Sequence, residues 1–342
     1  MPPMTRRFSI VLATALAACG LVSCGGGDSN ELTIYSGRTK ELIEPLLNDF
    51  ANETGIDIAV RWGDSADLAV LLSEEGDRSP ADVFLSQSPG AIGFVDGEHR
   101  LVPLSDDVLN EVPERFHATD GDWVGLSGRV RVIVYDAADM DESEVPNSVF
   151  DLTDPEYKGR VGVAPTNGSF QDFISTMRTM RGDDETLAWL KALDENDVHT
   201  YPNNIAIREA VQSGEIDFGL VNHYYNEQAK HEDPDGTTTE NHFMPGEDPG
   251  SMILTTAVGI LATAPEDQRD EAERFVKFLL SEEAQQYFAD ETFEYPLAAG
   301  VQPSTDLPPL DELPHPTVDL SDLGGGLERT RELIRDSGLE SS

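Results

Sequence analysis

Two adjacent tyrosines, Tyr224 and Tyr225, are the residues of this sequence best suited to metal chemistry. They stand in "NHYYNE", directly after the apolar run "IDFGLV", with polar residues on both sides. Adjacent side chains diverge in strands and in helices, so the pair is not expected to form one core patch. A phenolate is a hard donor, and only a strongly Lewis-acidic ion displaces its proton at neutral pH. Fe(III) suits two phenolates best; the alternative is that the rings pack against or cap the edge of a lobe.

Alternating strands and helices are expected to position this pair. The N-terminal part of the chain predicts strands at 31–36, 56–62 and 81–86, separated by helices at 40–55 and 66–76. This order indicates a parallel sheet with helices on both faces.

A second alternating series follows the long β-rich run 122–136, which is of the kind that crosses from one lobe to another. That series ends on the strand 216–222, directly before the tyrosines. Another β-rich run at 251–264 comes next, and a helix pair or one long helix at 270–290 and a last helix at 326–338 follow it.

The predicted fold class is therefore α/β, a two-lobed hinged binding protein in which each lobe is a mostly parallel sheet flanked by helices. We expect 31–129 with 255–305 to form lobe 1, and 130–254 with 306–342 to form lobe 2. Such proteins close on a ligand held between the lobes, at the carboxyl ends of parallel strands. The segments "SGRTKE", "SQSPG" and "NHYYNE" each follow a predicted strand. Three loops are therefore expected to meet at one cleft.

Several strings of the sequence match the pattern of a known family: "LTIYSGR", "SPADVFLSQ", "LSGRVRVIVYD", "RVGVAPTNGSFQD", "AVQSGEIDFGLVNHYY" and "EYPLAAGV". In them the chain resembles the ferric-ion-binding proteins of bacterial iron ABC transporters, in order from about Glu31 to Gly338. The resemblance implies a Venus-flytrap fold, Fe³⁺ as the transported ligand, and delivery to a membrane permease and its ATPase. It also implies that Tyr224 and Tyr225 are the metal-binding phenolates.

The family's other protein ligands are missing at the matching positions. One branch has a histidine where this chain has Thr39 and a glutamate where it has Gln87, and another branch has a tyrosine at Asn167. These three residues are expected to line the cleft without binding iron strongly. Two phenolates alone leave about four positions of an octahedral Fe(III) ion open.

An exogenous anion is predicted to complete the site, because the family often binds iron together with a synergistic anion. Carbonate, phosphate and citrate are the candidates, since a guanidinium binds each of them in bidentate fashion and a helix N-terminus favours an anion. The predicted anion-binding residues are Arg38, Arg129, Arg131, Ser169, Asn204 and Asn222. The family resemblance implies the anion-binding role of Asn204 and Asn222. Arg38 is favoured among the arginines, and the alternative for each arginine is a salt bridge to a surface acid.

Other aromatic and imidazole side chains near these loops are expected to have different roles. Tyr35 alternates with Ile34 in a strand and is expected to be structural, and Tyr201 lies near the same loops. His223 is a candidate to touch the metal, although adjacent residues diverge. His231 and His242 have no metal-ligand spacing.

The N-terminus predicts export and a lipid anchor. Residues 1–23 have the basic start and short apolar run of a signal peptide, and both cysteines stand in lipobox-like contexts. Cys24 is preferred over Cys19 as the lipidation site, because "GGGDSN" after it then reads as a flexible tether, which makes 24–30 the expected tether segment. The expected location is the outer face of the cell membrane.

Composition excludes some partners. The chain has 23 basic and 65 acidic residues, a net charge of −42, so nucleic acid is a poor partner. We expect no enzyme, because the chain has no G-x-S-x-G elbow, H-E-x-x-H motif or phosphate loop. We also expect a monomer. The alternative function is a binding protein of the same fold for a polyamine, a phosphonate or another small anion.

Overall fold

A computed structural model describes residues 31–303 and 307–339. The predicted signal peptide (1–23), the tether (24–30) and both cysteines, Cys19 and Cys24, lie outside the described residues.

Three parallel strands begin the fold, namely β1 (Glu31–Ser36), β2 (Asp57–Trp62) and β3 (Val83–Ser86). Helices α1 (Lys40–Thr54) and α2 (Ser65–Glu75) connect them, as the sequence predicts. The buried residues of α1 recur at helical spacing, and the helix ends because Gly55 adopts a left-handed conformation with φ 71°. Each βα connection places a loop at the carboxyl end of a strand.

Two long strands, β5 (Trp123–Asp136) and β10 (Ile253–Leu261), join the two halves of the fold. Strand β10 is antiparallel to both β3 and β5, so the sheet is mixed rather than purely parallel. Residues 123–130 of β5 pair with β10, whereas residues 131–136 pair with strands β8 (Phe218–Asn222) and β9 (Thr239–His242). The main strand order is β2-β1-β3-β10-β5-β8-β6-β7, in which β6 is Val161–Val163 and β7 is His199–Thr200. Beside this path, β4 (Leu101–Val102) pairs with β10, and β9 and β11 (Tyr295–Pro296) pair with β5.

The second half repeats the strand–helix alternation around a parallel group. Its elements are β6 (Val161–Val163), α5 (Gly168–Arg181), α6 (Asp183–Glu195), β7 (His199–Thr200), α7 (Asn204–Gln212), β8 (Phe218–Asn222), α8 (Tyr224–Glu232) and β9 (Thr239–His242). Strand β6 is parallel to β7 and to β8. The predicted second α/β series is therefore confirmed.

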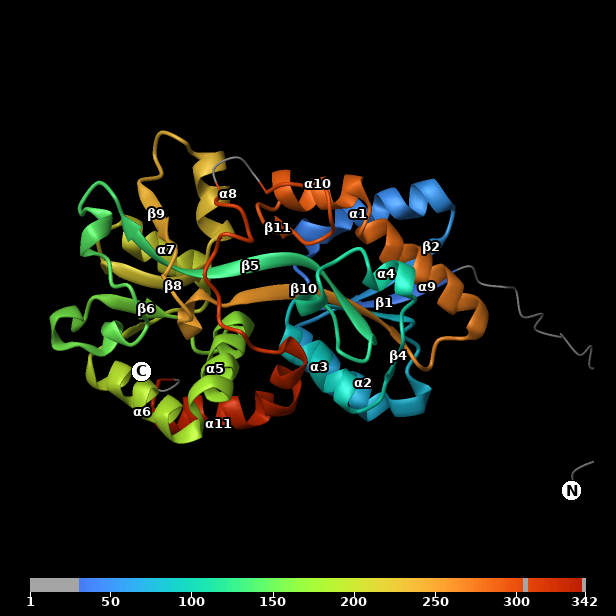
Figure 1. Ribbon diagram of the computed structural model, residues 1–342, viewed down its shortest axis with the longest axis horizontal. Helices are drawn as coiled ribbons and strands as arrows, with labels where there is room; N and C mark the ends of the chain where they lie inside the picture. Colours follow the sequence, from blue (N-terminus) through green and yellow to red (C-terminus); the bar gives the residue numbers. More distant parts are fainter. Residues whose placement is uncertain (1–30, 304–306, 340–342) are drawn as a thin grey trace, which may run out of the picture. The chain divides into compact units, whose positions relative to one another are not determined.

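Helices cover both faces of the sheet in each half of the fold (Figure 1). Helices α1 and α9 (Glu266–Leu279) lie on one face of the first sheet, and α2 and α3 (Pro89–Gly97) lie on the other. In the second half, α7 and α8 lie opposite α5 and α6. The remaining elements are β4 (Leu101–Val102), α4 (Asp106–Leu109), α10 (Glu282–Asp290), β11 (Tyr295–Pro296) and α11 (Leu327–Ser337). The predicted segment 270–290 is thus a helix pair, in which the Ser281 hydroxyl caps α10.

A C-terminal segment contacts elements of both halves. The 3₁₀ helix η7 (Leu320–Gly326) packs on α3, while α11 packs on α5 and α6. A Cβ on Gly324 would lie 2.1 Å from the backbone carbon of Gly93, so only glycine allows this approach. The division into lobes, with 306–342 in lobe 2, stays a prediction.

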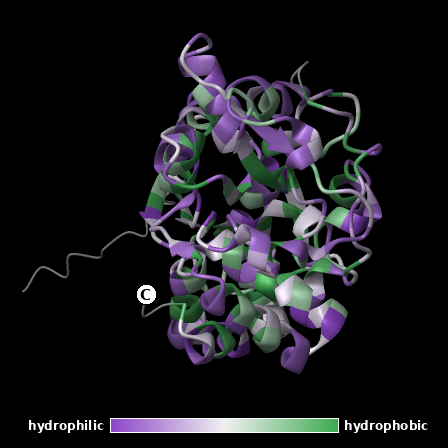
Figure 2. Ribbon diagram, turned by 90° about the vertical axis from the view of Figure 1, so that its left-hand side faces the viewer, coloured by the Kyte–Doolittle hydropathy of each residue, from purple (hydrophilic) through white to green (hydrophobic). Residues whose placement is uncertain are grey.

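The core follows the strands. Both β5 and β10 are buried along their whole length. Figure 2 shows hydrophobic residues on the inner strands and many hydrophilic residues on the outer helices and turns. Within 31–303 and 307–339, no helix combines the length and the hydropathy needed to cross a bilayer.

Candidate metal-binding cleft

A cavity of about 690 Å³, partly open to solvent, lies where the strand-end loops of the two halves meet. Its wall contains the N-terminal ends of α2 and α5 and the Ser88 cap of α3, and helix N-termini favour anions. The lining residues are Gly37, Thr39, Asp64, Ser65, Ala66, Gln87, Ser88, Arg129, Asn167, Gly168, Ser169, Gln171, Asn222, Tyr225 and Leu327.

The two tyrosines begin helix α8 directly after strand β8. Their rings stack with centroids 4.1 Å apart and planes 30° apart. Both residues lie in the first turn of α8, where adjacent side chains usually diverge, yet their rings stack, so the expectation that the pair does not form one patch is wrong here. Tyr225 lines the cavity, and Tyr224 is only 1% exposed behind it.

Burial sets the protonation state of the inner phenol. Desolvation, followed by the neighbouring Tyr225, raises the pKa of Tyr224 well above 10, although the Arg129 guanidinium opposes this shift. Without a metal, Tyr224 is therefore a neutral phenol at physiological pH. A cation that binds its oxygen must displace the proton.

His223 holds the tyrosine loop in place and has no nitrogen left for a metal. Its Nδ1 accepts a hydrogen bond from the Val130 amide at 3.1 Å, and its Nε2 donates to the Phe293 carbonyl at 3.0 Å. Burial lowers the pKa of His223 to about 4, so the ring is neutral. The suggestion that His223 touches the metal is wrong in this arrangement, because both ring nitrogens anchor the loop to β5 and to the segment before β11.

A buried charge network lies behind the tyrosines. Arg38 forms an ion pair with Glu294, and both side chains have no solvent exposure. Arg38 also donates to the Thr256 hydroxyl at 2.8 Å, so the structure does not bring it to the cavity wall. Arg129 does line the cavity, and its Nε lies 4.0 Å from Glu294. Burial opposes ionisation of Glu294, but Arg38 outweighs it and lowers the pKa of this carboxyl.

A second network joins the remaining predicted anion-binding residues. The Asn167 side-chain oxygen accepts hydrogen bonds from the Ser169 hydroxyl at 2.6 Å and from Asn204 at 3.2 Å. The Asn204 side-chain oxygen in turn accepts a hydrogen bond from the backbone amide of Asn222 at 3.1 Å. Arg131 lies behind this network and donates to Ser169 at 3.4 Å and to the Leu220 carbonyl at 3.1 Å. Ser169, Asn222 and Asn167 reach the cavity, whereas Asn204 and Arg131 support them from behind.

Three buried polar atoms at the cavity lack hydrogen-bond partners among the described residues. They are Arg129 Nε, Gln87 Oε1 and Asn222 Oδ1. Buried polar groups are nearly always hydrogen-bonded, so unsatisfied ones on a cavity wall indicate a polar ligand. The mixture of one donor and two acceptors suits a ligand that carries both negative and positive charge, such as a metal–anion complex.

The other candidates lie elsewhere. The Tyr35 phenol binds Glu75 at 3.0 Å, and the Tyr201 phenol binds Glu215 at 2.9 Å. His231 packs near Phe293, and His242 lies 3.1 Å from Glu142. Thr39 and Gln87 line the cavity, as the sequence suggests.

Sequence reasoning missed Glu294, Asp172 and Asp64. Asp172 on α5 accepts a hydrogen bond from the Ser88 hydroxyl at 2.7 Å and so links the two walls of the cavity. Burial raises the pKa of Asp172 to about 6. Of these three acids, only Glu294 could have been suspected from the sequence to be buried, because it is the lone acid in the otherwise mostly apolar string "EYPLAAGV".

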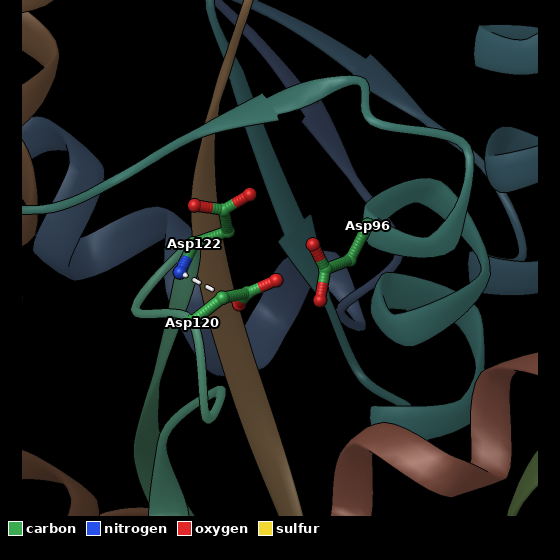
Figure 3. A group of neighbouring side chains, drawn as sticks. All are labelled: Asp96, Asp120 and Asp122. Atoms are coloured by element: carbon green, nitrogen blue, oxygen red, sulfur yellow. Dashed lines mark hydrogen bonds between the residues drawn. The ribbon is translucent and has the colours of Figure 1, made fainter.

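Three carboxylates form a separate acidic cluster, shown in Figure 3. Asp96 on α3 points toward Asp120 and Asp122, which precede β5, and none of the three lines the cavity. Ligand oxygens of all three lie within 4.8 Å of one another. Burial, followed by the charges of Asp120 and Asp122, raises the pKa of Asp96 to about 7. A retained proton therefore accounts for the proximity of the acids.

Replacing Asp96 by asparagine is expected to stabilise the protein at pH 8 and to change little at pH 4. The folded state keeps a proton that the unfolded chain loses, so wild-type stability falls as the pH rises from about 3.8 to about 7. Removing the ionisable group should add on the order of 2 to 4 kcal/mol above that range. Urea unfolding at both pH values measures this, with Asp49→Asn at an exposed site of α1 as the control. An equal effect at both pH values would contradict it.

Fold and cleft together define a two-lobed solute-binding protein, with loops from parallel strands converging on one cavity. The chain belongs to the bacterial extracellular solute-binding protein family, whose model matches residues 78–319. The resemblance to ferric-ion-binding proteins is confirmed by a relative that covers nearly the whole chain. The Fe(3+)-binding periplasmic protein of Serratia marcescens is 30% identical over 98% of this chain and 100% of its own length.

Solved structures agree with this membership. Iron-bound HitA from Pseudomonas aeruginosa superposes with a TM-score of 0.84 at 32% identity, covering 90% of this chain and 99% of HitA. The Trichodesmium protein IdiA (FutA), in complex with iron and citrate, superposes with a TM-score of 0.78 at 26% identity over 90% and 99% of the two chains.

Proposed function

We propose that this protein is the extracytoplasmic binding component of an iron(III) ABC transporter and that it binds Fe³⁺ through Tyr224 and Tyr225. The observation that carries the proposal is the stacked phenol pair, of which Tyr225 lines the cavity wall. Phenolates are poor ligands for soft or weakly acidic ions and good ones for Fe(III). The names of the Serratia and Pseudomonas relatives support the same metal.

A synergistic anion completes the site in this proposal. Two phenolates leave Fe³⁺ with one net positive charge, and carbonate, phosphate or citrate then makes the complex anionic. Arg129, whose Nε has no hydrogen-bond partner among the described residues, and the N-terminus of α5 at Ser169 offset that charge, and Asn222 orients the anion. Arg38, Arg131 and Asn204 act indirectly, by fixing Glu294, Ser169 and Asn222. The iron–citrate complex of the Trichodesmium relative supports citrate as one candidate.

Delivery to a permease and its ATPase follows from membership of a solute-binding family. The protein then acts as a monomer, without enzymatic activity, held at the outer face of the membrane by a lipid on Cys24. Its hinge lies in the strands β5 and β10, which run between the two halves.

Titration of the metal-free protein with Fe(III) nitrilotriacetate tests the proposal. In bicarbonate, phosphate or citrate, we expect a visible phenolate-to-iron charge-transfer band that saturates at one iron per protein. In buffer without these anions, the band should be weaker or shifted. No band in any of the buffers would contradict iron binding.

The same-fold alternative is tested on the same samples. Arg129 and the helix N-termini at the cavity also suit a small anion without iron. Methylphosphonate and spermidine are therefore added without metal, and thermal unfolding is followed. A larger stabilisation by either compound than by Fe(III) with bicarbonate would favour the alternative.

A further inference from the structure

The wall of the cavity built from the loops after β1, β2 and β3 holds a carboxylate at Asp64. It directly follows the carboxyl end of β2 and is the N-cap residue of α2. Among the cavity-lining residues that the structure describes, Asp64 is the one acid. Among the other described lining residues, Arg129 is the one with a charged side chain.

Close packing fixes Asp64 beside the two neighbouring strand-end loops. A Cβ on Gly37 would lie 2.0 Å from the Ser65 hydroxyl, so the loop after β1 lies directly against the start of α2. The Ser65 hydroxyl also accepts a hydrogen bond from the backbone amide of Gln87 at 2.9 Å, and this bond attaches the loop after β3 to the start of α2. Asp64 therefore stands next to the neutral residues Thr39 and Gln87 on one rigid wall.

The Asp64 carboxylate is available to a ligand. It is exposed at the cavity, and the hydrogen bond it accepts from the Ala66 amide, at 2.9 Å, uses only Oδ1. Its charge acts across the cavity, because it is one of the groups that raise the pKa of Asp172 on α5. A second, independent sign of a ligand here is Asn222, which is 1% exposed and whose Oδ1 has no partner among the described residues.

We propose that Asp64 is a third protein ligand of the bound iron and supplies a hard oxygen from the wall opposite Tyr224 and Tyr225. This inference rests on the proposed iron function. Carboxylate oxygen matches Fe(III) as phenolate oxygen does. A ligand from each wall also makes iron itself the link that holds the two halves closed, so that binding and closure are coupled.

The test compares Asp64→Asn with Asp67→Asn in the full-length protein. Asparagine keeps the shape of Asp64 and is an equally good N-cap, so α2 should be retained. Asp67 is an exposed acid in the first turn of the same helix and does not line the cavity, so its variant controls for net charge. Iron affinity is measured in bicarbonate by competition with nitrilotriacetate, and the charge-transfer band is recorded in each case.

For Asp64→Asn we expect at least a tenfold loss of affinity, since even groups that only support metal ligands are worth about 10- to 100-fold. The band should move to longer wavelength, because the metal loses an anionic donor. Asp67→Asn should behave as wild type. Unchanged affinity and band in Asp64→Asn, or a loss of affinity with an unmoved band, would overturn the assignment. If wild type itself shows no band, the proposed function fails instead, so the two failures are distinguishable.

Discussion

Replacing both Tyr224 and Tyr225 by phenylalanine is expected to abolish the visible iron band and to lower iron affinity by at least about 1,000-fold. The estimate follows because loss of a single supporting group at a metal site already costs about 10- to 100-fold, and here two direct donors are removed. Phenylalanine keeps both rings and so keeps their stacking at 4.1 Å. The change therefore removes the metal chemistry and leaves the packing.

The double variant is also the one least open to a folding artefact. Tyr224 is only 1% exposed and its ring stacks on Tyr225, and phenylalanine retains both rings, so the packing of the pair is kept. Tyr201→Phe serves as the control, because its phenol binds Glu215 and does not line the cavity. Equal thermal unfolding of the metal-free variants verifies the fold. Colour that persists in the double variant would show that other side chains bind the iron.

The position of the tyrosine pair could be predicted from the sequence because the cause is local. A buried strand, "IDFGLV", ends at Asn222, and the chain then turns into a helix, so the carboxyl end of the strand fixes where the phenols lie. The same reasoning placed Ser169 correctly, at the start of a helix that reaches the cavity. Each of these inferences needs only the residues next to the site.

The roles of the arginines could not be predicted, because they depend on contacts between distant residues. Arg38 follows a strand end, as a cleft residue should, yet its partner Glu294 lies 256 residues further along the chain. A buried guanidinium needs a compensating carboxylate, and the sequence does not say which of many acids supplies it. Arg129 Nε lies 4.0 Å from the Glu294 carboxylate and has no hydrogen-bond partner among the described residues, since Arg38 makes the closer contact with Glu294.

The sheet shows a similar limit. The strand–helix alternation predicts parallel strands, and the pairs β1–β2, β1–β3 and β6–β8 are parallel. The direction of β10 depends on the path of the chain before it. Its antiparallel pairing with β3 and β5 therefore cannot be predicted from the residues of β10 alone. Asp64 was missed for the same reason, since its exposure to the cavity depends on contacts of Ser65 with two other loops.

Acidification is expected to weaken iron binding by at least about tenfold for each pH unit, which is the slope for one displaced proton. Burial, and then Tyr225, raise the pKa of Tyr224 well above 10, so the metal-free protein holds this phenol proton throughout the neutral range. The iron-bound form lacks that proton, so a lower pH favours the metal-free form. Competition with a chelator between pH 5.5 and 8, corrected for the chelator's own titration, measures the slope.

Proton release distinguishes iron binding from the anion-only alternative. In weakly buffered solution, each Fe(III) bound to wild type should release at least one proton from the phenols, beyond those from hydrolysis of the metal. Tyr224→Phe removes the phenol with the raised pKa, so it should release about one proton fewer. A small anion held by Arg129 and the α5 N-terminus displaces no phenol proton. Its affinity would then show no such slope, and equal proton release by wild type and Tyr224→Phe would argue against the tyrosinate site.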